Sequence, residues 1–144
     1  MADEHPARLA SQRSMRAVEG KTKEAWLSLF TDDAFIEDPV GISPLDPEGK
    51  GHRGNTAIGV FWDTFIGPNQ IKFDIRQSYA CGNEVANVGA ITTTTPDGTK
   101  AVAEGVFVYK VNTEGKLVSL RAFWEFEQMM ARMMPSAASV EASP

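Results

Sequence analysis

Ile71-Lys72-Phe73-Asp74-Ile75-Arg76 alternates apolar with charged residues, as a strand does when one face is buried and the other meets water. The same period continues downstream. Residues 84–95 are rich in Val, Ile and Thr, and residues 101–111 and 117–128 alternate similarly, so each predicts a strand. A Pro-Asp-Gly turn separates the first two of these segments. The chain after residue 70 therefore predicts a run of antiparallel strands.

Before residue 70 the apolar residues mostly follow helical spacing. We expect a first helix over residues 6–18, a second behind a Thr22 cap, and a third behind an Asn55 cap that ends at Gly67. Their inward faces hold Ala10, Ser14, Ala17 and Val18, then Trp26, Leu29 and Phe30, then Ile58, Phe61, Trp62 and Phe65. Residues 34–38 predict a short strand, and residues 41–54 a long loop in which His52 is expected to be solvated, with a lid role as the alternative.

Helices followed by antiparallel strands predict an α+β fold. We expect one domain over residues 1–134 and a mobile tail over residues 135–144, which are mostly Ala, Ser, Pro and Glu. Three helices against a single sheet favour a strongly curved, mixed or antiparallel sheet shaped like a cone. Such a cone encloses a cavity, and that cavity is the expected binding site.

The composition excludes several classes of function. Fourteen Lys and Arg residues against 19 Asp and Glu residues give a formal net charge of −5, which disfavours nucleic acid and anionic membrane as partners. One cysteine and two histidines argue against a disulfide framework and a metal centre. No apolar run approaches a membrane span, and no phosphate loop or dinucleotide fingerprint occurs. We expect a cytoplasmic protein without metal or cofactor.

Asp38 is the strongest candidate for chemistry. It shares strand parity with Ala34 and Ile36, so it is predicted to point where apolar side chains point. A carboxylate there is costly unless it is paired or can change protonation state, and a desolvated carboxylate is a better proton acceptor. The alternative is a turn-capping role before Pro39, and these residues alone leave both open.

Three blocks of sequence resemble the bacterial ketosteroid isomerases, or steroid delta-isomerases, of the nuclear-transport-factor-2-like and SnoaL-like superfamily. They are Leu29-Phe30-Thr31-Asp32-Asp33-Ala34-Phe35-Ile36-Glu37-Asp38-Pro39-Val40-Gly41, then Gly54-Asn55-Thr56-Ala57-Ile58 with Phe61-Trp62, and Gly115-Lys116-Leu117-Val118-Ser119-Leu120-Arg121-Ala122. The resemblance implies a cone-shaped α+β fold and a homodimer. It also implies that Asp38 is the general base, which moves a proton from C4 to C6 of a Δ5-3-ketosteroid through a dienolate.

Two departures from the family pattern concern the groups that hold the dienolate. The family uses a tyrosine on the first helix and a protonated aspartate on a later strand. In this sequence the tyrosine position falls at or beside Ser14, and the aspartate position falls on Phe107. Because each such donor typically contributes about 3–4 kcal/mol, their loss predicts a weak isomerase unless other donors replace them.

Replacement donors can be named. Tyr109 has the strand parity of Phe107, so its hydroxyl is expected either in the cavity or at its rim, and Ser14 is a weaker donor. Expected wall residues for an apolar, steroid-like ligand are Phe61, Trp62, Phe107, Trp124, Val40 and Ile91, with core packing as the alternative for the two indoles. Asn87 indicates either a polar cavity patch or a dimer interface.

The sequence thus predicts a cofactor-free ketosteroid isomerase-like enzyme in which Asp38 transfers the proton. Three alternatives stay open. The cavity can bind steroid-like ligands with little turnover, or the fold can run other acid–base chemistry such as dehydration, cyclisation or epoxide opening. The Asp-Arg-Asp arrangement typical of the epoxide hydrolases of this fold has no clear match here. The third alternative is a dimerising interaction module with a filled cavity.

Overall fold

The computed structural model describes residues 5–134. In chain order these residues form the following elements: α1 (Pro6–Glu19), α2 (Lys23–Leu27), β1 (Phe30–Glu37), β2 (His52–Arg53), α3 (Gly54–Phe61), the π-helical turn η2 (Trp62–Ile66), β3 (Gln70–Cys81), β4 (Glu84–Thr94), β5 (Lys100–Val111), β6 (Leu117–Trp124) and α4 (Phe126–Ala131). The predicted α+β class is confirmed. The tail predicted over residues 135–144 lies outside the described residues.

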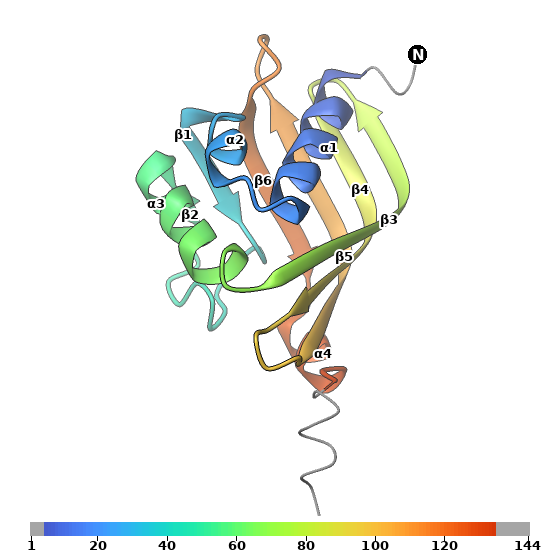
Figure 1. The fold of residues 1–144 in the computed structure, drawn as a ribbon. Helices are drawn as coiled ribbons and strands as arrows, with labels where there is room; N and C mark the ends of the chain where they lie inside the picture. Colours follow the sequence, from blue (N-terminus) through green and yellow to red (C-terminus); the bar gives the residue numbers. More distant parts are fainter. Residues whose placement is uncertain (1–4, 135–144) are drawn as a thin grey trace, which may run out of the picture.

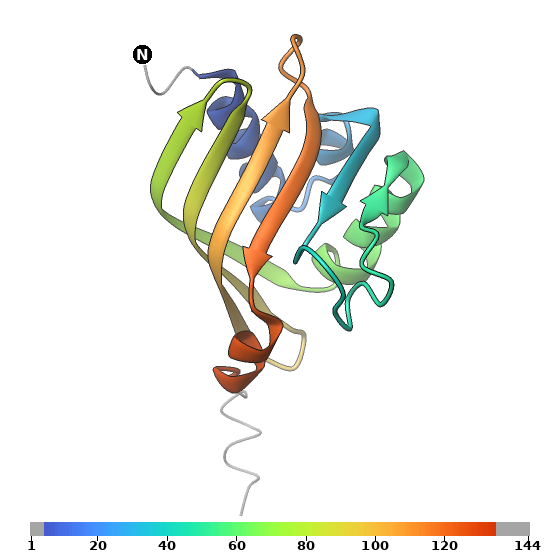
Figure 2. The same ribbon diagram turned by 180° about the vertical axis from the view of Figure 1, so that it is seen from behind.

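All six strands belong to one curved, unclosed sheet in the order β2-β1-β6-β5-β4-β3. Strands β1 and β6 run parallel and every other neighbouring pair is antiparallel, so the sheet is mixed as predicted. Helices α1 and α2 lie across its concave side, and α3 stands beside β1 (Figure 1). Seen from behind, strands β3 to β6 lie in front of α1 and α2 (Figure 2). The cavity lies between the concave face and the helices.

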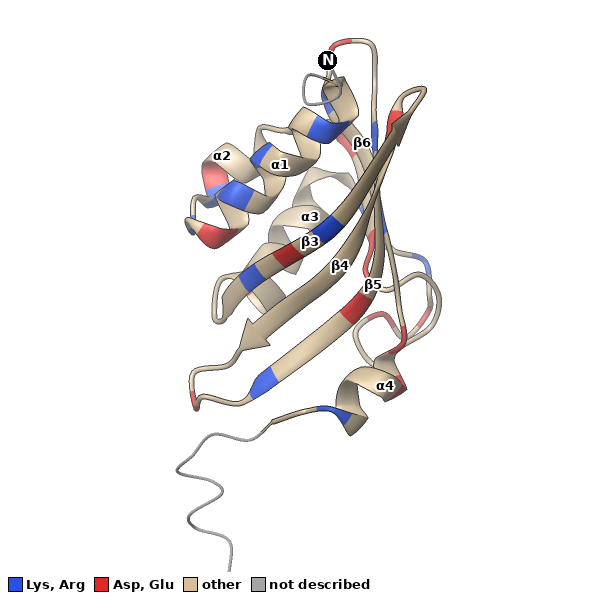
Figure 3. Cartoon of the chain, turned by 90° about the vertical axis from the view of Figure 1, so that its right-hand side faces the viewer, with Lys and Arg blue, Asp and Glu red and all other residues tan. Residues whose placement is uncertain are grey.

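The alternation predicted for residues 71–76 is confirmed along β3. Its apolar residues are half-buried and its charged residues are exposed, and the charged positions are visible as separate bands along the strand (Figure 3). The phase shifts between Ile75 and Gln77, where the pairing of β3 with β4 is irregular. Such irregularities increase the local bend of a strand, so this one helps to curve the sheet.

Two paired glycines stand at the bend. Gly89 of β4 lies opposite Gly105 of β5. A Cβ atom on Gly89 would overlap the carbonyl oxygen of Asp74, and a Cβ atom on Gly105 would overlap that of Phe123. Neighbouring strands approach each other more closely here than any side chain allows, which is the usual reason for glycine inside a strand.

Three local expectations are wrong. Helix α2 ends at Leu27, because Phe30 already pairs with Leu117 of β6 and is 2% exposed. Asn55 does not cap α3, which begins at Gly54; its side-chain amide instead donates to Asp32 Oδ1 at 3.1 Å. The last strand ends at Trp124, where α4 follows after one residue. The predicted end of the third helix at Gly67 is confirmed, with its last turn, η2, π-helical.

Candidate active site

A cavity of about 220 Å³ lies between the concave face of the sheet and helices α1, α2, α3 and α4. Its wall is mainly apolar. The sequence-predicted residues that line it are Ser14, Asp38, Phe61, Ile91, Phe107, Tyr109 and Trp124. They come from α1, the end of β1, α3, β4, β5 and β6, so the curved sheet brings together side chains that are far apart in the chain. An apolar pocket with a few convergent polar groups is the usual form of a small-molecule site.

Two residues expected on the wall lie elsewhere. Trp62 is 5% exposed and packs in the core, with its ring centroid 5.2 Å from that of Trp26. The wide η2 turn starts at Trp62, and Phe61 and Phe65 face the cavity instead. Val40 follows the strand end, and its N–H donates to the Ala122 carbonyl at 2.9 Å. Its main chain therefore joins β1 to β6 just beyond Asp38.

Asp38 lies where strand parity predicts. Ala34 and Ile36 on the same side of β1 are 1% and 0% exposed, and Asp38 is on the cavity wall. The Asp38–Pro39 peptide bond is cis. The indole Nε1–H of Trp124 donates to Asp38 Oδ1 at 2.6 Å. This is a short bond of the kind that a charged acceptor forms, and it fixes the orientation of the carboxylate.

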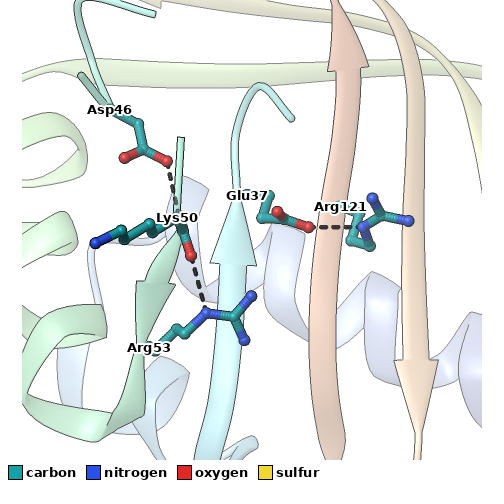
Figure 4. A network of polar contacts seen from close by, with 6 residues as sticks. Glu37, Asp46, Lys50, Arg53 and Arg121 are labelled. Atoms are coloured by element: carbon teal, nitrogen blue, oxygen red, sulfur yellow. Dashed lines mark hydrogen bonds and ion pairs between the residues drawn. The ribbon is translucent and has the colours of Figure 1, made fainter. Parts of the chain in front are cut away.

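Glu37, the residue before Asp38, joins this end of β1 to β6 on the opposite face of the sheet. Glu37 accepts a hydrogen bond and ion pair from Arg121 Nε of β6 at 2.7 Å (Figure 4). The loop that follows is tied back by its own contacts, since the Gly51 N–H donates to Asp46 Oδ2 at 2.8 Å and Arg53 Nε donates to the Lys50 carbonyl at 2.8 Å. Together with the Val40 bond, these contacts give the carboxylate of Asp38 a rigid support.

Two opposing effects act on the pKa of Asp38. Burial among apolar side chains disfavours the charged form and raises the pKa above its ordinary value, and this is the larger effect. The hydrogen bond from Trp124 favours the charged form and lowers the pKa. The net result is a carboxylate that takes up a proton more readily than an exposed aspartate does.

Tyr109 lies near Asp38 and at the end of a chain of polar groups. Its pKa is raised by burial, raised further by the Asp38 charge, and lowered by a hydrogen bond with Ser14. The Ser14 oxygen accepts the indole N–H of Trp26 at 3.0 Å, so Trp26, Ser14 and Tyr109 form a chain of polar contacts. Chained hydrogen bonds of this kind polarise one another.

Several wall residues were not among the predicted ligand contacts. Phe65 and Met129 line the cavity, the latter because α4 turns back where a continued strand was expected. Phe126 and Met129 both line the wall, and their spacing of three residues is typical of a helix. The alternation of apolar residues that precedes them predicted a strand instead. Asn69 and Thr93 add polar groups to the wall, far from Asp38 along the sheet.

Asn87 faces α1 on the inner side of the sheet and is 1% exposed. Its amide donates to Ser11 Oγ at 3.1 Å, so it joins β4 to α1 and does not border the main cavity. Glu104 of β5 is exposed and pairs with Arg76 at 2.6 Å.

The expectation that His52 is solvated is wrong. It is half-buried, its ring centroid lies 4.8 Å from that of Phe61, and its Nε2 is buried without a hydrogen-bond partner among residues 5–134. Burial lowers the pKa of His52, and the Asp46 charge opposes that effect.

Within the described part of the chain, no group of three or more His, Cys, Asp or Glu side chains is placed to hold a metal ion. No helix between residues 5 and 134 is long and apolar enough to cross a membrane.

Comparisons with known proteins agree with this geometry. The sequence pattern of the SnoaL-like domain matches residues 11–120. The steroid delta-isomerase of Nocardioides simplex is 30% identical over 115 residues, which cover 80% of this chain and 86% of that protein. The crystal structure of the Δ5-3-ketosteroid isomerase from Mycobacterium sp. is 36% identical, with a TM-score of 0.83, over 90% of this chain and 98% of that one.

Two further structures show what similar chains bind or do. RV0760c from Mycobacterium tuberculosis, solved in complex with estradiol-17β-hemisuccinate, is 34% identical with a TM-score of 0.83, over 91% of this chain and 99% of that one. The epoxide hydrolase/cyclase-like enzyme SalBIII is 26% identical with a TM-score of 0.74, over 88% of this chain and 96% of that one.

Proposed function

Because this chain belongs to the SnoaL-like domain family, within which its relatives include steroid isomerases, we propose that it is a ketosteroid isomerase-like enzyme. Its substrate is a steroid or a similar polycyclic ketone held in the apolar cavity, and Asp38 is the general base. The observation that carries the proposal is the Asp38 carboxylate, supported from two strands and open to a cavity with mainly apolar walls.

The proposed reaction transfers a single proton. The Asp38 carboxylate removes a proton from C4, next to the ketone of a Δ5-3-ketosteroid, and a dienolate forms. The C5=C6 double bond moves to C4=C5 as Asp38 returns the proton to C6, so no atom is gained or lost. Burial favours the protonated aspartic acid between the two transfers, which supports this role for the carboxylate.

Tyr109 is proposed to donate a hydrogen bond from its hydroxyl group to the dienolate oxygen. Its hydroxyl is backed by Ser14 and Trp26, and Tyr109 lines the same cavity as Asp38, which supports action of the two groups on one ligand. Ser14 has the supporting role here. Phe61, Phe107, Trp124 and Ile91 are proposed to hold the rings of the ligand.

The test is turnover of 5-androstene-3,17-dione, followed by the absorbance of the conjugated enone. General acid–base groups typically contribute about 10²–10⁴ in rate, so Asp38→Asn is expected to lose activity by that factor. Asp74→Asn is the matched control, since Asp74 is exposed on the outer face of β3. Equal loss in both variants, or none in Asp38→Asn, rules out the proposed base.

A steroid-binding protein with little turnover is the second candidate. It is favoured by the absence of the two donors that the resemblance implies, since their positions fall at or beside Ser14 and on Phe107. Tight binding of equilenin without turnover of the dione identifies this function. The third candidate, other acid–base chemistry, is favoured by the similarity to SalBIII and predicts neither result. The interaction module needs a filled cavity, whereas this one is open.

The homodimer and the cytoplasmic location stay predictions. Size-exclusion chromatography with light scattering measures the first, and fractionation of the source cells measures the second.

A further inference from the structure

Two polar side chains on the cavity wall lie apart from Asp38 and Tyr109. They are Asn69, just before β3, and Thr93 near the end of β4. Thr93 pairs with Ile71, which follows Asn69 by two residues, so the two side chains line the same end of the cavity.

These two residues occupy the opposite end of the cavity from Tyr109. Thr93 pairs with Ala101 of β5, which is eight residues, or roughly 26 Å of strand, from Tyr109. Trp124, which holds Asp38, pairs with Gly105, four residues or roughly 13 Å from Ala101. All of these side chains line one cavity of about 220 Å³, so their polar groups lie closer together than the strand lengths. A ligand that reaches from Tyr109 past Asp38 to Thr93 must be elongated.

Both side chains keep unused hydrogen-bonding capacity. The Asn69 Nδ2 donates to the Phe65 carbonyl at 2.8 Å, which orients the amide and leaves its Oδ1 and second N–H available. The Thr93 hydroxyl has no side-chain hydrogen bond to any residue between 5 and 134. In an apolar cavity a small number of such groups fixes ligand orientation.

We propose that Asn69 and Thr93 form a second polar subsite that binds a hydroxyl group at the end of the ligand opposite its ketone. The inference rests on the proposed function, which puts the ketone at Tyr109. A hydroxyl can donate to Asn69 Oδ1 and accept from the Thr93 hydroxyl at the same time. A ketone can only accept, so it leaves Asn69 Oδ1 unpaired. The preferred class is therefore an elongated polycyclic keto-alcohol.

The test compares three steroids with the same 4-en-3-one ring system. They are testosterone, with a 17β-hydroxyl, 4-androstene-3,17-dione, with a 17-ketone, and 4-androsten-3-one, which lacks the second oxygen. Dissociation constants for each are measured by titration calorimetry against the full chain and its variants. The readout is the dissociation constant of the deoxy steroid divided by that of testosterone, because changes in this ratio cancel the general apolar contribution.

In the wild-type protein we expect testosterone to bind more tightly than the dione and the dione more tightly than the deoxy steroid. Thr93→Val preserves side-chain shape and is expected to lower the ratio by about three- to tenfold, the typical worth of one hydrogen bond. Asn69→Leu is expected to do the same. Thr92→Val is the matched control, since it makes the same change on the outer face of the same strand.

Each contrary outcome is distinct. If the wild-type protein binds all three steroids equally, the subsite is refuted while the proposed function stands. If it binds none, both are refuted. A ratio that Thr93→Val and Thr92→Val leave equally unchanged refutes the subsite as well. Asn69 also supports the Phe65 carbonyl, so Thr93→Val decides the matter if Asn69→Leu does not fold.

Discussion

Replacing Trp124 with phenylalanine keeps an aromatic ring on the cavity wall but removes the N–H that donates to Asp38 at 2.6 Å. A hydrogen bond to a charged group contributes about 1.5–3 kcal/mol. Because this bond favours the charged form, its loss in Trp124→Phe is expected to raise the pKa of Asp38. The direction follows from the wild-type balance, in which burial raises this pKa and Trp124 lowers it.

Two measurements follow the titration of Asp38 independently. In the pH profile of kcat/KM for enone formation, the acid limb is expected to move to higher pH, because Asp38 must be ionised to accept the proton. The ¹³C chemical shift of the Asp38 carboxyl group reports the same midpoint in the absence of any substrate. The second measurement remains informative even if the protein binds steroids without turning them over.

Trp62→Phe is the matched control, since Trp62 is a buried indole that packs on Trp26 and does not line the cavity. It is expected to leave the Asp38 midpoint unchanged. A wild-type midpoint in Trp124→Phe would refute the assignment of the indole N–H as the group that lowers the pKa. A shift of the Asp38 midpoint to lower pH in Trp124→Phe would contradict the direction assigned to the Trp124 hydrogen bond.

Three further variants test other parts of the structure. Asp38→Asn is expected to be more stable than the wild type at neutral pH. Because the pKa of Asp38 is raised in the folded protein, the free energy of unfolding of the wild type falls as pH rises above about 4. Denaturant unfolding at several pH values should show the difference between the two proteins vanish in acid. Tyr109→Phe is expected to lower kcat by about tenfold or more, and an unchanged kcat removes its hydroxyl from the reaction. Gly105→Ala forces a methyl group against the Phe123 carbonyl and should lower the free energy of unfolding by about 1–3 kcal/mol, whereas an unaltered melting temperature would mean that the strands relax freely.

Much of the fold could be predicted because strand patterns extend over many residues. The alternation at residues 71–76 depends on one buried face, and that face is the inner side of β3. Boundaries were harder. Phe30 fits a helical stripe, but pairing with Leu117, far away in the chain, places it in β1. The apolar residues around the end of β6 and the start of α4 suit either a strand or a helix. The local pattern therefore does not predict where β6 ends, and the packing of α4 against the cavity decides it.

The position of Asp38 followed from parity alone, because two neighbours of the same parity are fully buried. Its partner could not be foreseen, since Trp124 is 86 residues away and any indole on that face would fit the pattern. The backing of Tyr109 by Ser14 and Trp26 depends on how α1 and α2 cross, which no local pattern encodes. The π-helical turn likewise has no simple sequence signal, so Trp62 was expected on the wall.

The paired glycines Gly89 and Gly105 influence the shape of the cavity without contributing a side chain to its wall. Gly89 and Gly105 do not border the main cavity, yet the close strand approach at these two positions brings β5 against Trp124 of β6. A substitution at either residue therefore resizes the ligand space while every contacting side chain stays the same. Redesign of ligand choice therefore has two control points in the backbone of the sheet, which substitution of the wall residues alone leaves unchanged.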